Sequence, residues 1–291
     1  MPIRPVCRLV PFAALALAIA LALDTGGVRA QPVARPNPRD LPHIEDNSFL
    51  AEEAFNQDAG VVQHISQFTQ ARGSRAWQFT FTQEWPVGGV LHQLSYTLPL
   101  GRGDTGSPGT GDLMLNYRYQ LVANERGGSF VAPRVSVSVP TGDPKRGLGT
   151  GTTGVQVVVP VSQQLGEAFI THVDAGYTYF GAARDAAGVR GSLAIVNVTH
   201  SLVWLARPRF NVLIETVWTG AKRRSRGASS WDATLLLNPG VRWAYNFASG
   251  MQIVPGISFP VGVGPSAGEK QILLYFSVEH PFTRAARAAA K

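Results

Sequence analysis

The last apolar stretch of the sequence alternates between two kinds of side chain. Every second residue forms an apolar file: Ile272, Leu274, Phe276, Val278 and the aromatic Phe282. His280 interrupts this file. Polar residues lie between these positions, among them Gln271, Ser277 and Glu279. Because successive strand residues point to opposite faces, the pattern indicates one lipid-like and one water-like face. A strand of about ten residues with this alternation can cross a membrane as part of a barrel, although a strand of a soluble sandwich looks similar.

The amino-terminal residues have the three parts of a secretory signal peptide. Arg4 and Arg8 give a basic start, an apolar run covers residues 9–23, and a small-residue cleavage site ends at Ala30. An uncleaved anchor is the alternative, but the apolar run is short compared with the about 20 residues of a membrane helix. The single cysteine, Cys7, lies within residues 1–30, so the sequence predicts a mature chain without disulfides or a lipid anchor.

After residue 30 no apolar stretch is long enough for a membrane helix. Only helices and closed barrels satisfy their backbone polar groups in lipid, so membrane insertion of this chain requires a barrel. Charged residues make up 15% of the sequence, well below the roughly one quarter of soluble domains. The composition therefore agrees with the strand pattern.

The sequence from Val61 onward contains a regular series of strand candidates. They are residues 61–70, 76–85, 90–100, 111–122, 129–140, 154–164, 168–180, 192–206, 209–220, 231–246, 250–262 and 270–282. From the second strand on, short connections alternate with long ones such as GAARDAAGVRG and AKRRSRGASS. Outer-membrane barrels have short periplasmic turns and long external loops. We therefore expect an all-β fold, a transmembrane antiparallel up-and-down β-barrel of about twelve strands, over residues 61–282.

The regions on either side of the predicted barrel differ from it in composition. Residues 31–42 are proline-rich, and residues 47–56 fit a short helix capped by Asn47 or Ser48. We expect residues 31–60 to form a leader and a short helical or plug segment under or inside the barrel. Residues 283–291 form a basic C-terminal tail.

A cluster of basic residues precedes the tenth predicted strand. It consists of Lys222, Arg223, Arg224 and Arg226. Nucleic acid is not an expected partner because an exported chain does not routinely meet it. The expected partners are outer-membrane lipid, the phosphates of lipopolysaccharide, the barrel-assembly machinery that reads the C-terminal file, and a small-molecule solute.

Five runs, in order along the chain, resemble one protein family. They are EDNSFLAEEAFNQDAGVVQHI (45–65), APRVSVSVPTGD (132–143), THVDAGYTYFG (171–181), LNPGVRWAY (237–245) and IVPGISFPVGVG (253–264). They are similar to the outer-membrane family named for the MetA pathway of phenol degradation. The resemblance implies a β-barrel transporter with a link to aromatic compounds and offers no catalytic motif. His280 departs from the aromatic or apolar residue that is usual in a barrel-assembly signal.

Motifs of enzymes and metal proteins are not evident. The run GTGTTG at 149–154 matches a dinucleotide fingerprint by letters, but a strand follows it where a helix is required. His200 and Ser201 are adjacent in a strand, so they point to opposite faces and cannot act as base and nucleophile. We predict no catalytic residues, no metal site and no cofactor; His172 and Asp174, two residues apart on one strand face, are read as a lumenal polar pair.

The charged and polar residues predicted to face inward are the candidate functional residues. They are Glu84, Asp112, Arg118, Arg134, His172, Asp174, Glu215, Arg242 and Glu279. Such side chains set the electric field of a pore, or they pair across the lumen and stabilise a closed barrel. The sequence leaves both interpretations open.

Together these features favour a passive channel in the bacterial outer membrane for small, including hydrophobic or aromatic, solutes. A structural or adhesive barrel with a filled lumen is the first alternative, and a lipid-modifying barrel enzyme is the second.

Overall fold

The computed structural model describes residues 44, 48–104 and 106–283. The predicted signal peptide, the proline-rich leader, the capping residue Asn47 and the tail from residue 284 onward lie outside this part of the chain. Within the described residues, no helix combines the length and apolar character needed to cross a membrane.

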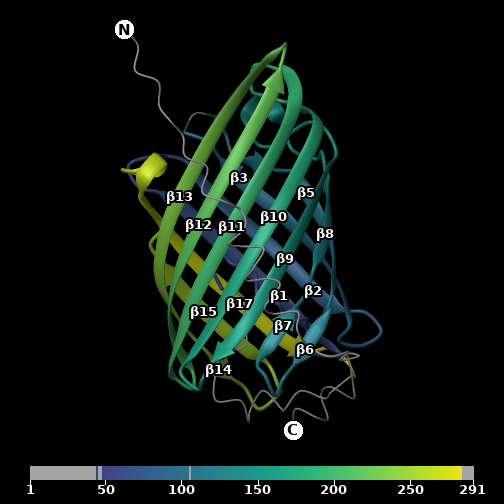
Figure 1. The fold of residues 1–291 in the computed structure, drawn as a ribbon, viewed down its shortest axis with the longest axis vertical. Helices are drawn as coiled ribbons and strands as arrows, with labels where there is room; N and C mark the ends of the chain where they lie inside the picture. Colours follow the sequence, from purple (N-terminus) through teal and green to yellow (C-terminus); the bar gives the residue numbers. More distant parts are fainter. Residues whose placement is uncertain (1–43, 45–47, 105, 284–291) are drawn as a thin grey trace. The chain divides into compact units, whose positions relative to one another are not determined.

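The described chain forms a closed antiparallel β-barrel of twelve strands (Figure 1). Several barrel strands are interrupted and therefore comprise two or three segments. The first half contains β1 (Val61–Ala71), β2 (Trp77–Pro86), β3 (His92–Arg102), β4 (Gly109–Thr110), β5 (Leu113–Tyr119), β6 (Val122–Asn124), β7 (Ser129–Val131), β8 (Arg134–Val139) and β9 (Gly154–Leu165). The second half contains β10 (Phe169–Arg184), β11 (Arg190–Arg207), β12 (Phe210–Ser225), β13 (Ala228–Trp243), β14 (Tyr245–Asn246), β15 (Gln252–Ser258), β16 (Val261–Gly262) and β17 (Gln271–Pro281). Two short 3₁₀ turns, η1 (Pro144–Arg146) and η2 (Gly264–Ser266), lie in loops.

The barrel closes where the first strand pairs with the last. The register of β1 and β17 runs from Val61 opposite Pro281 to Ala71 opposite Gln271 without a shift. On its other edge β1 pairs with β2, so β1 has no free edge. Closure leaves no row of unpaired backbone groups along this seam.

The predicted alternation of side chains is confirmed in the strands. In β5, Leu115 and Tyr117 are 48% and 40% exposed on the outer face, whereas Asn116 and Arg118 are buried inside. In β17, Leu274 is exposed on the outside, while Ser277 is buried. The barrel thus presents an apolar outer surface and a mostly polar interior, as a membrane on one side and water on the other require.

The connections differ between the two ends of the barrel. At one end, which we call the turn end, strands are joined across residues 87–91, 125–128, 166–168, 208–209 and 247–251. At the other, the loop end, β8 and β9 are joined by the longer segment 140–153, which contains η1. The start of β1 and the end of β17 pair at the turn end.

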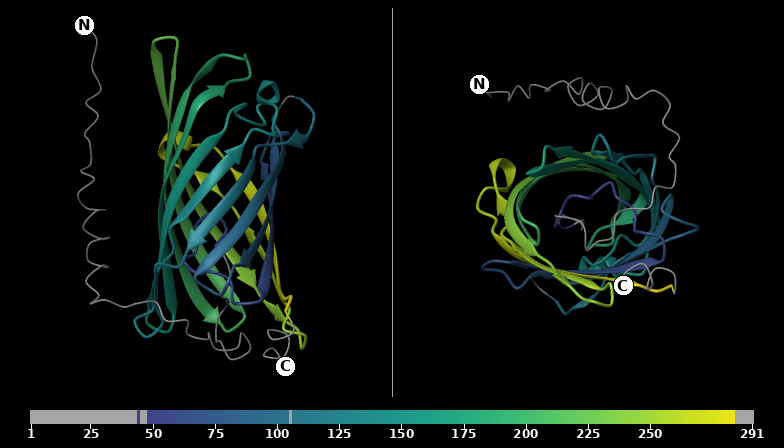
Figure 2. Two further views of the ribbon diagram at one scale, coloured as in Figure 1. Left: turned by 90° about the vertical axis from the view of Figure 1, so that its right-hand side faces the viewer. Right: turned by 90° about the horizontal axis from the view of Figure 1, so that it is seen from below.

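Two long loops predicted at the loop end are wrong. Residues 181–191 and 221–230 mostly continue the strands: β10 reaches Arg184, β11 starts at Arg190, and β12 and β13 are joined only by Arg226 and Gly227. Both linking residues have positive φ, 49° and 80°, as a two-residue hairpin turn of type I′ requires. The β10–β13 wall therefore rises above the rest of the rim (Figure 2). We call residues 181–191 and 221–230, which form this raised part of the wall, the extension.

The short helix predicted over residues 47–56 is also wrong in its described part. Residues 48–58 contain bends and no helix, and they run inside the ring of strands (Figure 2). We call residues 48–58 the inner segment. Its backbone N–H groups donate to barrel side chains, so they cannot form the i to i−4 bonds of a helix.

Candidate functional site

Side chains of the barrel wall hold the backbone of the inner segment. Glu215 Oε1 accepts hydrogen bonds from the backbone N–H groups of Leu50 and Ala51 at 2.8 and 2.9 Å. Four further N–H groups are bonded in the same way: Glu52 to Asp174, Ala54 to Ser162, Asn56 to Gln120 and Gln57 to Gln93. Because the inner segment has no secondary structure, these six donors depend on acceptors that converge on it from β3, β9, β10 and β12 and from Gln120, which lies between β5 and β6.

Three carbonyl groups of the inner segment are bonded as well, those of Phe49, Glu53 and Ala54. Gln67 Nε2 donates to the carbonyl of Phe49 at 2.6 Å, and Arg118 Nη1 donates to the carbonyl of Glu53 at 2.8 Å. Gln120 bonds Ala54 and Asn56 at once, donating to one and accepting from the other. The wall thus serves both donors and acceptors of the segment and fixes its path.

Phe49 anchors the segment by apolar packing. Its ring contacts Tyr275 edge to face, with centroids 5.5 Å apart, in a buried apolar cluster that includes Leu213. A Cβ atom on Gly240 or Gly256 would lie 2.5 Å from this ring. The close approach of Phe49 to β13 and β15 therefore depends on glycine at both positions.

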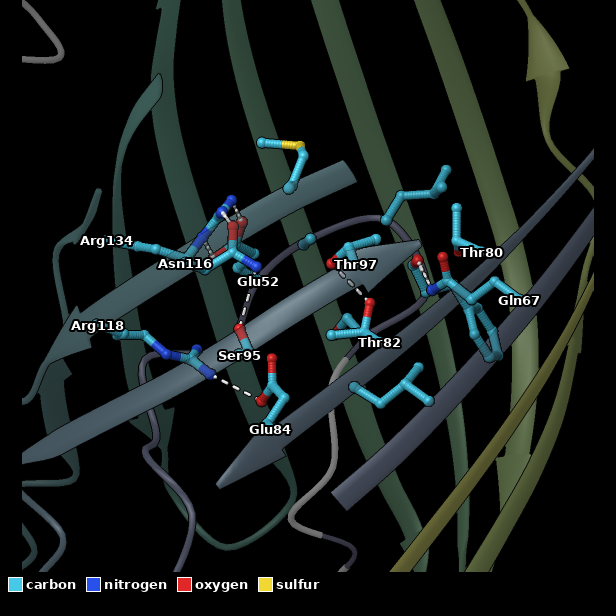
Figure 3. A pocket seen from close by; sticks show the side chains of 16 residues that line it. Glu52, Gln67, Thr80, Thr82, Glu84, Ser95, Thr97, Asn116, Arg118 and Arg134 are labelled. Atoms are coloured by element: carbon cyan, nitrogen blue, oxygen red, sulfur yellow. Dashed lines mark hydrogen bonds and ion pairs between the residues drawn. The ribbon is translucent and has the colours of Figure 1, made fainter. Parts of the chain in front are cut away.

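Two ion pairs lie beside the inner segment, on the wall formed by β2, β5 and β8 (Figure 3). Arg134 binds the carboxylate of Glu52 with Nε and Nη2, a bidentate arrangement. Arg118 pairs with Glu84 at 3.1 Å. Glu52 belongs to the inner segment and to no strand. Burial alone would raise the pKa of Glu52. The charge and hydrogen bonds of Arg134 outweigh burial and hold that pKa below its ordinary value.

A cavity of about 280 Å³ remains between the inner segment and this wall. Its lining combines apolar side chains, hydroxyl groups and both ion pairs: Phe49, Leu50, Ala51, Ile65, Met114, Ser48, Thr80, Thr82, Thr97, Ser95, Gln67, Asn116, Glu52, Glu84, Arg118 and Arg134 (Figure 3). The Thr82 and Thr97 hydroxyls bond each other at 2.9 Å. The cavity can therefore accommodate a small apolar body and pair with a polar substituent.

A second buried network lies on the wall formed by β9, β10 and β13. His172 Nδ1 lies 2.7 Å from Ser162 Oγ, and His172 Nε2 lies 3.5 Å from Glu53 Oε1. Arg242 Nη2 approaches the same carboxylate oxygen at 3.3 Å. A serine, a histidine and a glutamate meet in this network. Ser162 and His172 are at most 1% exposed, and Ser162 Oγ also accepts a hydrogen bond from the backbone N–H of Ala54. The network binds the inner segment to the wall.

Most of the residues predicted to line the lumen lie around the inner segment. Glu84, Arg118, Arg134, His172, Asp174, Glu215 and Arg242 all contribute to the contacts described above. Glu279 belongs to the inner file of β17 and is opposite Gln63 and Gln252. Asp112 lies apart from them: it accepts bonds from the N–H groups of Gly142 and Thr150 and shapes the connection between β8 and β9.

Several contact residues were missed by the sequence reasoning. Five uncharged residues hold the inner segment as closely as the charged residues do: Gln63, Gln67, Gln93, Gln120 and Ser162. A sixth, Asn238, donates to the Glu215 carboxylate that holds the segment. They share the inward file of their strands, so the alternation could have placed them inside. Their side chains carry no charge, so nothing in the sequence distinguishes them from other polar strand residues.

Within the described residues, no group of three or more His, Cys, Asp or Glu side chains is arranged to hold a metal ion. The site is therefore defined by the inner segment, its polar contacts and the cavity beside it.

A twelve-stranded barrel with an apolar exterior and a polar lumen defines a protein of the outer-membrane barrel class in its fold. Residues 43–265 match the family described as "Putative MetA-pathway of phenol degradation", and the chain belongs to this family.

A solved structure shows the same fold. An outer membrane channel from Pseudomonas putida F1 is 14% identical, with a TM-score of 0.60, and the match covers 82% of this chain and 99% of that one. The CymD monoaromatic hydrocarbon channel is 10% identical, with a TM-score of 0.43 and coverage of 78% and 90%. The KdgM porin is 8% identical, with a TM-score of 0.43 and coverage of 76% and 99%. No curated protein matches the chain.

Proposed function

We propose that the protein is an outer-membrane channel for the passive diffusion of small solutes, with a lumen narrowed by the inner segment. The observation that carries the proposal is the cavity of about 280 Å³ that remains inside a closed barrel with an apolar exterior. The turn end would face the periplasm and the extension the cell exterior, since external connections are the longer ones in such barrels.

The lining of the cavity supports a class of solute. Phe49, Ile65 and Met114 offer apolar contact, whereas Thr82 and Arg118 offer a hydroxyl and a cation. A phenol or a small aromatic acid combines an apolar ring with one polar group, so it matches both parts of the lining. The family description, which refers to phenol degradation, agrees with this class.

A filled, structural barrel is the second candidate. It is favoured by the six backbone N–H groups of the inner segment that are bonded to wall side chains, because a segment held so completely can remain in place permanently. In that case the cavity would be a closed void and no solute would pass.

Single-channel conductance separates the two candidates. The chain from residue 31 is refolded into a planar bilayer beside a variant lacking residues 31–58. We expect small steps from the first protein and larger steps from the second, because removal of the inner segment widens the lumen. A phenol and a benzoate are then added, and each is expected to reduce the ion current of the complete channel.

A variant lacking only residues 31–43 is the matched control. It shortens the chain but keeps the inner segment and its wall contacts, so its conductance should equal that of the chain from residue 31. Heat-modifiable gel mobility verifies folding for all three proteins. Folded barrels without steps, both with and without residues 31–58, would refute the channel and favour the filled barrel.

A further inference from the structure

Two histidines meet across the seam that closes the barrel. His64 is on β1 and His280 is on β17, and their Nε2 atoms lie 3.3 Å apart. The rings are nearly parallel, with centroids 5.4 Å apart and an interplanar angle of 24°. In the register His64 is opposite Val278 and His280 is opposite Val62, so the pair is a diagonal one.

Both side chains point to the outer face. His280 continues the outward file of Leu274 and Phe276, which are 47% and 45% exposed, and both histidines are half-buried. On its other side His64 stacks on Phe81 of β2, with centroids 6.1 Å apart. The two imidazoles are therefore held in place by aromatic contacts and are still accessible from outside the barrel.

The separation of the two nitrogens matches that of two ligands on one metal ion. With Zn–N bonds of about 2.0–2.1 Å and a tetrahedral angle, two histidine nitrogens lie about 3.3 Å apart. A hydrogen bond between neutral imidazoles also occurs near this distance, with a proton where the metal would be. Binding of a metal to both Nε2 atoms thus needs a shift of that proton to Nδ1 of its ring, and the separation of the two nitrogens can stay as it is.

We propose that His64 and His280 form a two-histidine site for a zinc-like divalent cation at the barrel seam. Imidazole nitrogens suit Zn²⁺, Ni²⁺ and Cu²⁺ and discriminate against Mg²⁺ and Ca²⁺, which prefer oxygen ligands. Water completes the coordination, since no third His, Cys, Asp or Glu among the described residues joins the pair.

The position of the pair allows water to reach it. His64 is the fourth residue of β1, and His280 is the last residue but one of β17. At a rise of about 3.3 Å per residue, both lie within about 10 Å of the turn end, where the membrane interface would be. A hydrated ion can therefore reach the site without crossing the apolar belt.

The site would act as a clamp on barrel closure. A cation bound to both histidines joins the first and last strands, which are distant in sequence and adjacent only in the closed barrel. It binds the folded state and not the unfolded pair, so it stabilises the closed form by mass action. This role also gives a reason for the departure of His280 from the apolar file, and it is independent of the proposed channel function.

The test is a titration of the full chain, refolded in phospholipid vesicles, with ZnCl₂ and with MgCl₂. Calorimetry should give one Zn²⁺ per chain and no binding of Mg²⁺. The temperature at which the heat-modifiable band unfolds should rise with Zn²⁺ and return to its starting value after addition of a chelator. At free Zn²⁺ ten times the Kd, the folding equilibrium constant should be about 11-fold higher.

His64→Asn and His280→Asn should each abolish the binding and the rise in unfolding temperature. His92→Asn and His200→Asn are matched controls, because these histidines also lie on barrel strands but their ring nitrogens contact the hydroxyl groups of Tyr117 and Thr171. Both controls should respond to Zn²⁺ as the natural chain does. Zinc binding that survives in His280→Asn, or a folded natural chain that binds no Zn²⁺, would overturn the proposal.

A measurement on the unmodified chain removes any dependence on how the variants fold. Diethyl pyrocarbonate acylates accessible histidines, and mass spectrometry locates the modified residues. Zinc should protect His64 and His280 and leave the acylation of His92 unchanged. Equal acylation of all three with and without zinc would refute the site.

Discussion

Glu215 is the residue that binds the inner segment most directly. It is fully buried. One of its carboxylate oxygens accepts hydrogen bonds from two backbone N–H groups, and the other accepts one from the Asn238 side-chain amide. Glu215→Ala should leave the N–H groups of Leu50 and Ala51 without acceptors, at a cost on the order of 3 kcal/mol. Amide hydrogen exchange at these two residues should therefore accelerate by about 100-fold.

The matched control for this prediction is Glu167→Ala, which removes the same side chain from an exposed turn. Exchange at Leu50 and Ala51 should be unchanged in that variant. Unaltered exchange in Glu215→Ala would show that the other contacts of the inner segment suffice without this carboxylate.

The Glu52–Arg134 pair makes the inner segment sensitive to acid. Because the folded-state pKa of Glu52 is lowered, the pair stabilises the seated segment above the ordinary value of 4.5 and loses this contribution as the pH falls through the folded-state pKa. Conductance should be constant from about pH 7 to about pH 5 and should rise in more acidic solution.

In Arg134→Met the rise in conductance should begin at higher pH, because the cation that lowers the pKa of Glu52 is gone. If conductance depends on pH in the same way in both proteins down to about pH 3, the pair has no role in this response.

At the scale of single residues, the alternation was sufficient to predict which side chains lie inside. Arg118, Glu215 and Arg242 are buried, and each has a bonding partner, as a buried charged group requires. The partners of Arg134 and Arg242 could not be predicted, since Glu52 and Glu53 come from a segment whose path depends on the whole barrel. Register within one strand says nothing about a segment that crosses the lumen.

Among the elements, the hairpin of β12 and β13 offers the sharpest test. Gly227 has φ of 80°, and a β-branched residue there costs on the order of 1–3 kcal/mol. Gly227→Val should loosen the tip of the extension and leave the barrel intact. Trypsin should then cleave at Arg224 and Arg226 about tenfold faster, while the thermal transition of the barrel stays the same.

Ala228→Val, one residue further along, is the control. Ala228 pairs with Ser225 as a strand residue, where valine is well tolerated, so cleavage should not accelerate. Equal rates for the two variants would show that the positive φ of Gly227 does not limit the turn.

The elements were predictable to the extent that local pattern determines them. Strand positions and the rhythm of connections follow from alternation and turn residues, and the closed barrel follows from both. The extension was missed because its Gly, Ser and Arg residues are typical of loops, while pairing with a neighbouring strand overrides that preference. The helix over 47–56 was predicted from capping residues, but the wall side chains compete successfully for the same N–H groups.

For the whole molecule, the two faces of the barrel imply where a membrane would surround it. Leu274 is 47% exposed between Phe68 and Ile257, which are opposite it on the neighbouring strands. Leu274→Arg should place a cation in hydrocarbon and lower the free energy of unfolding in vesicles by about 2–4 kcal/mol. Ala228→Arg adds the same side chain at the exposed tip of the extension, above the apolar belt, and should change that free energy by less than about 0.5 kcal/mol. Urea titrations of both variants measure the difference, and equal effects would mean that the apolar face is not embedded in lipid.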